Sequence, residues 1–334
     1  MAFANSQVSD LIATTIDSRT KDPTDNLSTN NALIRRLKTK GNIKPVSGGN
    51  TIFQEIFYDD PATASAGSYS GYDTLNTTPD SPISAAQYLL KHYASPVTIA
   101  GTEILANSGK EQMADLLGTR VEIAEARLMN KIDLDLHGDG TGNGGKNIVG
   151  LSAMISTTPT TGTYGNIDRA TWTFWRNIST TSTIVNGGAA TAATIQNLIN
   201  TVALQLVRGS DYADLIYMGQ TAYALYLASL QAYQKVESQG NDMAGAGFTA
   251  LKYYGAGNSA DVILGGGIGG NQTATRMDFI NSSHVFFRPH SKRNFTNIGG
   301  DRQPVNQDAV IRFIGWSGAL TCDYSRANAV ALTS

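Results

Sequence analysis

Residues 44–91 limit the possible folds of this chain more than any other segment. Between Lys44 and Lys91 there is no lysine or arginine, and apolar runs at both ends flank a middle rich in Gly, Ser, Thr and Pro. The acidic residues of the segment are Glu55, Asp59, Asp60, Asp73 and Asp80. Such a middle buries too little apolar surface to offset the entropy that its backbone loses on ordering. We therefore predict a long two-stranded arm that projects outward and is ordered by a neighbour, which indicates an assembly subunit and argues against an enzyme.

The composition of the chain also favours an assembly. Its 334 residues are enough for roughly two domains. Only 16% of them are charged, whereas an ordinary soluble domain has about 25%. Because a free monomer usually needs a charged surface, much of this chain is expected to be covered by neighbours. The alternative is a neutral, secreted, β-rich protein.

Charge, cysteine content and hydropathy exclude several classes of protein. The net charge of −2 implies no strong general attraction to nucleic acid. The single cysteine, Cys322, excludes an intrachain disulfide framework and a zinc site built from several cysteines of one chain. No run approaches the roughly 18 to 20 apolar residues of a transmembrane helix, and residues 1–30 lack a signal-peptide pattern. We expect a chain that is made in a cytoplasm and has no membrane partner.

Two regions beside the acidic segment have clear patterns. Residues 31–44 contain five basic residues and no acid, which predicts either a solvated helix face or an arm that lies on an acidic neighbouring surface. Those basic residues are Arg35, Arg36, Lys38, Lys40 and Lys44. Residues 51–58 and about 83–99 predict two long strands on either side of the acidic loop.

A long helix is predicted from Ser108 to about residue 136. Ser108 and Glu111 match a capping box, and apolar residues then recur at helical spacing. Such a helix is about 45 Å long at 1.5 Å per residue. Gly118 lies in its first half, where glycine costs roughly 1 kcal/mol relative to alanine. It indicates either close packing against a bulky neighbour or a bend point.

The second half of the chain has a different pattern of predicted helices and strands. In residues 189–306, helical patterns alternate with short strands, which predicts a compact α/β unit. Residues 309–316 and 318–323 predict a terminal hairpin that returns to the sheet near the long helix.

No motif indicates a catalytic centre, a cofactor or a metal. The glycine-rich run 265–270 lacks the Lys-Ser/Thr of a phosphate-binding loop. The loop that begins at Asp139 has Gly150 where a calcium loop needs glutamate. No carboxylate cluster accompanies His284 and His290 along the sequence, which favours a surface or packing role for both. Nucleophile-elbow and zinc-protease motifs are also missing.

Several motifs, in the same order over nearly the whole chain, resemble those of tailed-phage major capsid proteins. They are Leu37-Lys-Thr-Lys-Gly-Asn-Ile-Lys-Pro-Val-Ser-Gly-Gly-Asn50, Ile52-Phe-Gln-Glu55, Ser70-Gly71-Tyr72 with Leu75, Asn107-Ser-Gly-Lys-Glu111, Asp139-Gly-Thr141 with Gly145-Lys146, and Ile167-Asp-Arg-Ala-Thr-Trp-Thr-Phe-Trp-Arg176. The last of these is the most specific. That family has the Hong Kong 97-type fold, so the resemblance implies an α+β chain. The implied parts are an N-terminal arm (1–47), an extended β-hairpin loop (48–96), a peripheral domain (97–188) with a long spine helix (about 108–137), an α/β axial domain (189–306) and a return to the peripheral domain (307–334).

The resemblance also implies a function. It predicts a major capsid (coat) protein, without enzymatic activity, that self-assembles through hexamers and pentamers into the icosahedral head around phage double-stranded DNA. The expected location is the virion, after assembly and procapsid maturation in a bacterial cytoplasm. The alternative is the shell of an encapsulin-type nanocompartment, which shares the fold and holds cargo enzymes.

The resemblance further predicts partners. Some members cross-link covalently through a lysine of the extended loop, but residues 45–90 contain none. Non-covalent contacts or a separate cement protein must then stabilise the shell. Some members carry a long scaffolding segment before the arm, whereas this arm begins almost at Met1, so a separate scaffolding protein is expected. A portal and packaged DNA, contacted non-specifically, complete the expected partners.

Two hypotheses concern contacts and motion in such a shell. The acidic loop of one subunit is expected to lie over a basic patch of its neighbour, where each exposed ion pair contributes under about 1 kcal/mol but many copies set the register. Candidates for that patch are Arg35, Arg36, Lys38 and Lys40, or Arg120 or Arg127 on the spine helix. The second hypothesis is that Gly118 lets the spine helix bend in an immature shell and straighten on expansion.

Overall fold

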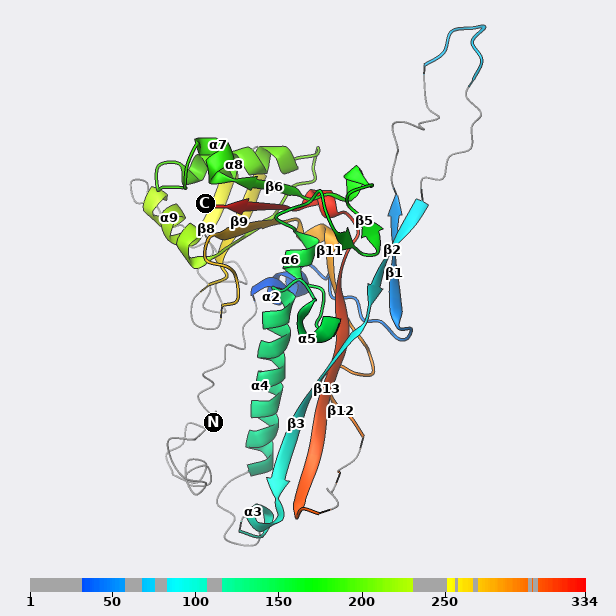
Figure 1. Ribbon diagram of the computed structural model, residues 1–334, viewed down its shortest axis with the longest axis vertical. Coiled ribbons are helices and arrows are strands. Elements are labelled where there is room, and N and C mark those ends of the chain that lie inside the picture. Colours follow the sequence, from blue (N-terminus) through cyan, green and yellow to red (C-terminus); the bar gives the residue numbers. More distant parts are fainter. Residues whose placement is uncertain are drawn as a thin grey trace.

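The computed structural model describes residues 32–57, 68–75, 83–106, 116–230, 251–255, 258–266, 270–299, 302 and 306–334. The predictions made for Asp59, Asp60, Asp80 and the Ser108 capping box lie outside these residues. Helices and strands are mixed in an elongated molecule (Figure 1). A long helix beside two long strands forms one end, and a six-stranded sheet with its helices forms the other.

Helix α4 (Leu116–Leu136) is the long helix of the elongated end. Ala124, Leu128, Ile132 and Leu136 recur every four residues along one face and are all buried. This face packs on β3 (Lys91–Ala100), which lies beside β13 (Ala309–Cys322). The helical periodicity of the sequence thus corresponds to one helix face that is buried in the main core. Within the described residues, no helix combines the length and the apolar run needed to span a bilayer.

The predicted terminal hairpin is wrong, because β13 runs without a turn from Ala309 to Cys322. Gly318 pairs with Lys91 of β3 and with Pro289 of β11 (Val285–Pro289), so the ladder continues through the expected turn. A Cβ at Gly318 would lie 2.5 Å from the Trp316 ring and 2.9 Å from the Arg288 carbonyl oxygen. Glycine is therefore required here for close packing inside a strand.

The strand predicted over residues 83–99 is divided at Leu90. Its first part, β2 (Ile83–Leu89), pairs with β1 (Thr51–Phe57), whereas β3 pairs with β13. The buried Leu90 lies between them, and its amide donates to the Asn50 carbonyl oxygen at 3.0 Å. Residues 83–99, predicted as one strand, therefore contribute strands to two different sheets.

The six-stranded sheet has the order β6-β14-β10-β7-β9-β8. Its strands are β6 (Ile178–Thr181), β14 (Ala329–Leu332), β10 (Arg276–Ile280), β7 (Leu215–Met218), β9 (Asn258–Leu264) and β8 (Leu251–Gly255). Helices α7 (Ser182–Asn186), α8 (Ile195–Leu206) and α9 (Gln220–Leu230) accompany it. Two of the strands, β6 and β14, come from outside residues 189–306. Conversely, β11 and β12 (Thr296–Asn297) lie within that range but pair with β13.

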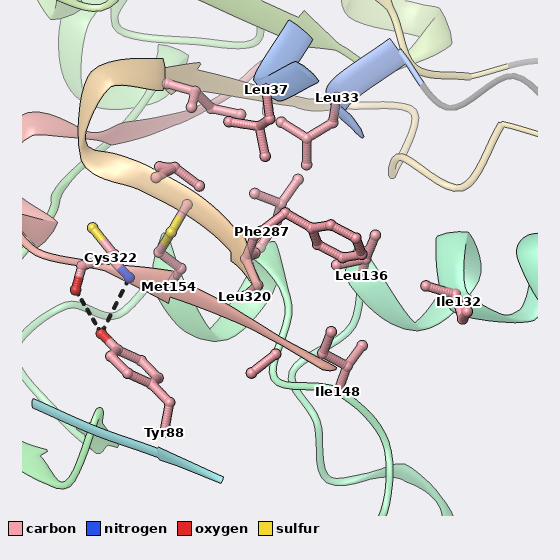
Figure 2. Close-up of a cluster of buried hydrophobic side chains, with 14 of the residues drawn as sticks. Leu33, Leu37, Tyr88, Ile132, Leu136, Ile148, Met154, Phe287, Leu320 and Cys322 are labelled. Carbon is pink, nitrogen blue, oxygen red and sulfur yellow. Dashed lines mark hydrogen bonds between the residues drawn. The ribbon is translucent and has the colours of Figure 1, made fainter. Parts of the chain in front are cut away.

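Short elements connect these parts. They are α2 (Ala32–Thr39), α3 (Gly101–Ala106), α5 (Gly142–Gly145), α6 (Leu151–Met154), β4 (Thr163–Tyr164), β5 (Ile167–Asp168), and the 3-10 turns η1 (Thr173–Trp175), η4 (Ser282–His284) and η5 (Ser325–Ala327). Helix α2 packs into the main core, where Leu33 and Leu37 are fully buried near Leu136 and Phe287 (Figure 2). The basic segment predicted as an arm or a solvated face is therefore anchored by its apolar side in the described part of the chain.

Candidate functional site

The β1–β2 hairpin presents two different faces. In its register, Ile52 pairs with Tyr88 and Ile56 with Ser84, and the side chains of Ile52, Ile56 and Tyr88 are buried. The alternate residues point the other way. Phe57 pairs with Ile83 and both side chains are exposed, that of Phe57 by 75%.

We define the hairpin face as this exposed set. It consists of Phe53, Glu55, Phe57, Ile83 and Leu89, with the exposed Gln87 opposite Phe53. Phe53 is 63% exposed, and Glu55 lies between the two phenylalanines on the same strand face. Scattered exposed apolar residues are normal, but a contiguous group on one strand face is characteristic of a binding surface. In Figure 1 the hairpin stands to one side of β13, and residues 68–75 lie beyond its end, away from the rest of the chain.

Hydrogen bonds fix the inner face of the hairpin to the core. The Tyr88 hydroxyl donates to the Cys322 carbonyl oxygen at 2.8 Å (Figure 2). Burial raises the pKa of this hydroxyl well above its ordinary value, so it remains a donor. The backbone N–H of Gln87 donates to the Gly165 carbonyl oxygen at 2.8 Å. Gly165 has φ +60°, and a Cβ there would lie 3.0 Å from the Ala86 side chain, so glycine suits both the turn and the close approach.

The motif at residues 167–176, together with the nearby Tyr164, packs against the base of the hairpin. Tyr164 contacts Tyr88 edge-on at 5.4 Å between ring centroids and stacks on Trp175 at 6.0 Å. The Trp175 indole donates to the Tyr164 carbonyl oxygen at 2.9 Å. The buried Arg169 guanidinium lies 5.2 Å from the Tyr164 ring and donates to the carbonyl oxygens of Ala153 (2.9 Å) and Met154 (2.6 Å). The specific motif therefore holds the base of the hairpin in place.

A cavity of about 390 Å³ opens beside the hairpin base. Its polar lining includes Gln87, Lys91, Asp139 and Asn166. None of these is a nucleophile paired with a base. In the described part of the chain, no group of three or more His, Cys, Asp and Glu side chains could hold a metal ion.

A second exposed surface follows α4. The α4 outer face, as we define it, consists of Ile123, Arg127, Lys131 and Leu134, all exposed and spaced to lie on the side away from the buried stripe. The Lys131 ammonium pairs with Asp135 at 2.8 Å. Arg120, at the start of this face, pairs with Glu103 of α3 at 2.8 Å. This face therefore carries two basic groups between two apolar ones.

On helix α2, Arg36 and Lys40 form ion pairs within the chain. The Arg36 guanidinium pairs with Asp214 at 3.0 Å and with Asp261 at 2.7 Å, and the Lys40 ammonium lies 3.2 Å from Asp214. Although burial alone would raise it, the pKa of Asp214 is lowered by hydrogen bonds from Ser282 and by these two cations. The network fastens α2 to the six-stranded sheet. No sequence spacing could reveal it, because the partners are 178 and 225 residues away from Arg36.

The remaining predicted residues are spread over the molecule. Lys38 is exposed on α2, and Arg35 is half-buried on the same helix. Glu55 lies on the hairpin face, and the exposed Asp73 carboxylate accepts from the Ser70 amide at 2.7 Å. Gly118 lies in the first described turn of α4. Among the acidic candidates that the structure describes, Glu55 lies on a contiguous apolar surface and Asp73 does not.

Comparison with known proteins gives a fold. No family model and no curated protein matches the sequence. Among solved structures, a chain of the cyanophage A-1(L) capsid asymmetric unit is 16% identical, with 95% of this chain and 97% of that chain covered and a TM-score of 0.63. This chain has a Hong Kong 97-type fold. The mixed α/β fold implied by the sequence motifs is therefore confirmed.

Two further structures have the same fold. A chain from Mycobacterium phage Bobi is 12% identical, with 98% and 99% of the two chains covered and a TM-score of 0.54. A chain of the holo-SrpI encapsulin complex from Synechococcus elongatus PCC 7942 is 10% identical, with 99% and 96% covered and a TM-score of 0.52. The fold is thus shared by a phage capsid and an encapsulin, so the choice between them depends on other observations.

Proposed function

We propose that this protein is a phage major capsid protein, and that its copies self-assemble into an icosahedral head around double-stranded DNA. The likeness to the cyanophage capsid chain over 95% of this chain carries the proposal. The exposed hairpin face supports it independently, because a surface of this kind needs a partner. The role is structural, and the protein's place is the virion.

The parts implied by the motifs are proposed to have their usual positions in the fold. Helix α4 is the spine of the peripheral domain, and the β1–β2 hairpin is the base of the extended loop. The six-stranded sheet with α7, α8 and α9 is the axial domain, to which β6 and β14 add strands from outside residues 189–306. Strand β13, beside β3 and α4, is the return to the peripheral domain. Residues 1–47 include the N-terminal arm, with α2 as its anchored end.

We infer that the hairpin face of one copy lies on the α4 outer face of the next. Phe53 and Phe57 would then cover Ile123 and Leu134, and Glu55 would meet Arg127. Burial of a large apolar side chain contributes about 1.5–3 kcal/mol, whereas an exposed ion pair contributes under about 1 kcal/mol. Apolar contact therefore supplies most of the affinity, and the charge pair sets the register.

The basic patch of α2 is a less favoured partner for the acidic loop. Arg36 and Lys40 already neutralise Asp214 and Asp261 in their own chain. Lys38, which is exposed, is the residue of that patch whose charge reversal tests the contact without breaking this network.

The proposed partners follow from the same role. They are other copies of the chain in hexamers and pentamers, a scaffolding protein, a portal, DNA contacted non-specifically, and a cement protein where the shell uses one. The absence of a lysine in residues 45–90 supports stabilisation by non-covalent contacts.

The first experiment is electron microscopy of the full chain, expressed alone and with a candidate scaffolding protein. We expect closed shells or capsomer rings. In parallel, Phe57→Asp should abolish or strongly reduce assembly while the circular dichroism spectrum stays unchanged. The matched control is Ile184→Asp, since Ile184 is 76% exposed on α7, away from both surfaces. A chain that stays monomeric in every condition contradicts the proposed function. A Phe57→Asp variant that assembles as well as the parent contradicts the hairpin contact.

The second candidate is an encapsulin-type compartment, favoured by the likeness to the SrpI encapsulin chain over 99% of this chain. Particles purified from their natural host distinguish the two functions. Nuclease-protected double-stranded DNA of uniform length supports the phage head, whereas an enclosed protein in its place supports the compartment.

A further inference from the structure

His284 joins two parts of the fold through both of its ring nitrogens. It ends the turn η4, between β10 of the six-stranded sheet and β11. Its Nδ1 lies 2.8 Å from Oδ1 of Asp323, the residue that follows β13. Its Nε2 lies 3.0 Å from Oδ2 of Asp211, in the turn that precedes β7. Folding thus brings two carboxylates to His284 that no local sequence pattern indicated.

The chemistry of these two contacts requires a particular protonation state. A neutral imidazole carries one N–H and one acceptor nitrogen, and an ionised carboxylate only accepts. A neutral His284 could donate to Asp211 or to Asp323, but its other nitrogen would face an acceptor. Only the imidazolium, which donates from both nitrogens, makes both bonds.

Further hydrogen bonds hold the two aspartates beside the ring. The Asn281 side-chain NH2 group donates to Oδ1 of Asp211. The Asp323 amide donates to the His284 carbonyl oxygen at 3.2 Å, which keeps the two residues adjacent. The Asp211 carboxylate and the Asp323 backbone are therefore held beside the ring while the ring charge can change.

The other groups that face the ring are identifiable. Tyr324 meets it edge-on, with 5.5 Å between centroids, and the Arg208 guanidinium lies 3.3 Å from the Tyr324 hydroxyl. Arg288 acts on Asp323 through its charge. The His284 side chain is 25% exposed, so protons can reach it from solvent.

We propose that His284 is a proton-operated clasp, which ties the turn before β7 to the end of β13 while the ring is charged and loosens when it loses its proton. Hydrogen bonds to Asp323 and then to Asp211 raise the pKa of His284 above its ordinary value of 6.5, against the lowering effect of partial burial. Because the folded pKa is raised, the clasp is fully present below the unfolded pKa. Its contribution is lost as pH rises through the folded pKa. The proposal concerns the folded subunit and does not depend on the proposed function.

The test is pH-dependent hydrogen–deuterium exchange at the imidazole Cε1 position of each histidine, read by mass spectrometry on the full chain, assembled or not. The midpoint for His284 should lie above 6.5 and fall in both Asp211→Asn and Asp323→Asn, which keep an oxygen acceptor but remove the charge. The exposed His92, whose Nδ1 contacts the Ser317 hydroxyl, is the internal control and should keep its midpoint in both variants. A His284 midpoint at or below 6.5, or one that neither variant moves, overturns the proposal.

A second readout follows stability. His284→Gln should lower the thermal unfolding midpoint at about pH 6 and much less at about pH 9, since the charged clasp exists only at the lower pH. An equal loss at both pH values indicates lost packing alone and contradicts the clasp. If this variant does not fold, the exchange midpoints of the two Asp variants decide the question.

Discussion

The Tyr88 hydroxyl donates to the Cys322 carbonyl oxygen at 2.8 Å, and this bond fastens the inner face of the β1–β2 hairpin to the strand that runs along α4. The two residues are 234 positions apart in the sequence. The exposed hairpin face is therefore presented on a base that is fixed in the main core.

Tyr88→Phe should destabilise the chain by about 1 kcal/mol, because it removes one hydrogen bond and leaves a buried carbonyl oxygen with one partner fewer. Chemical denaturation of the unassembled chain measures the change. Tyr72→Phe is the control, since the Tyr72 side chain is fully exposed and its replacement should have no effect. Equal stability of the Tyr88 variant and the parent would show that the hydroxyl contributes nothing.

Arg36→Met should destabilise the chain by about 3 kcal/mol, because it leaves the buried Asp214 and Asp261 without their main cation. Lys38→Met, on the exposed side of the same helix, should be nearly neutral.

The Arg36 network also predicts a pH dependence. The pKa of Asp214 is lowered in the folded chain, so its stabilising contribution is present above the ordinary value of 3.8 and is lost as pH falls through the folded pKa. The stability difference between parent and Arg36→Met should therefore shrink in strong acid. A difference that stays constant with pH contradicts the assigned network.

Gly318→Ala should cost about 1–3 kcal/mol, since the new methyl group would overlap the Trp316 ring and the Arg288 carbonyl oxygen. Gly188→Ala is the matched control, because nothing lies within 4 Å of a Cβ built there. Thermal unfolding of both variants measures the contrast. If both substitutions are tolerated equally, the close packing inside β13 is not as described.

Charge reversal tests the register of the proposed contact between copies. Glu55→Arg and Arg127→Glu should each slow assembly modestly, because an exposed ion pair contributes under about 1 kcal/mol. The double variant should restore it, because the pair is re-formed with its signs exchanged. Light scattering follows assembly, and Lys38→Glu is the control for the alternative patch on α2. Rescue of Glu55→Arg by Lys38→Glu, and not by Arg127→Glu, would move the contact to α2.

Gly118→Ala should strengthen α4 by about 1 kcal/mol, the usual difference between glycine and alanine in a helix. If the helix bends at Gly118 in an immature shell, this variant should slow or trap the expansion to the mature form. Time-resolved small-angle scattering of shells measures expansion. An unchanged expansion rate rejects the bend hypothesis.

The sequence alone determined the elements that depend on local periodicity. The buried stripe of α4, the apolar stripe of α8 and the strand β1 follow from spacings of two to four residues, which one element satisfies by itself. The capsid-like motifs indicated the fold, because they lie in order along the chain. Of the candidate site, the sequence indicated the acidic hairpin and Glu55 but not the apolar face around it.

Only the tertiary structure decided the relationships between distant residues. Residues 309–316 and 318–323 suggested a hairpin, but pairing of Gly318 with both β3 and β11 keeps β13 continuous. Arg36 was expected to reach a neighbouring copy, whereas folding brings Asp214 and Asp261 to it. The carboxylates of His284 come from 39 and 73 residues away. Such partners are chosen by how strands from separate parts of the chain pack together, and no local pattern of residues encodes that choice.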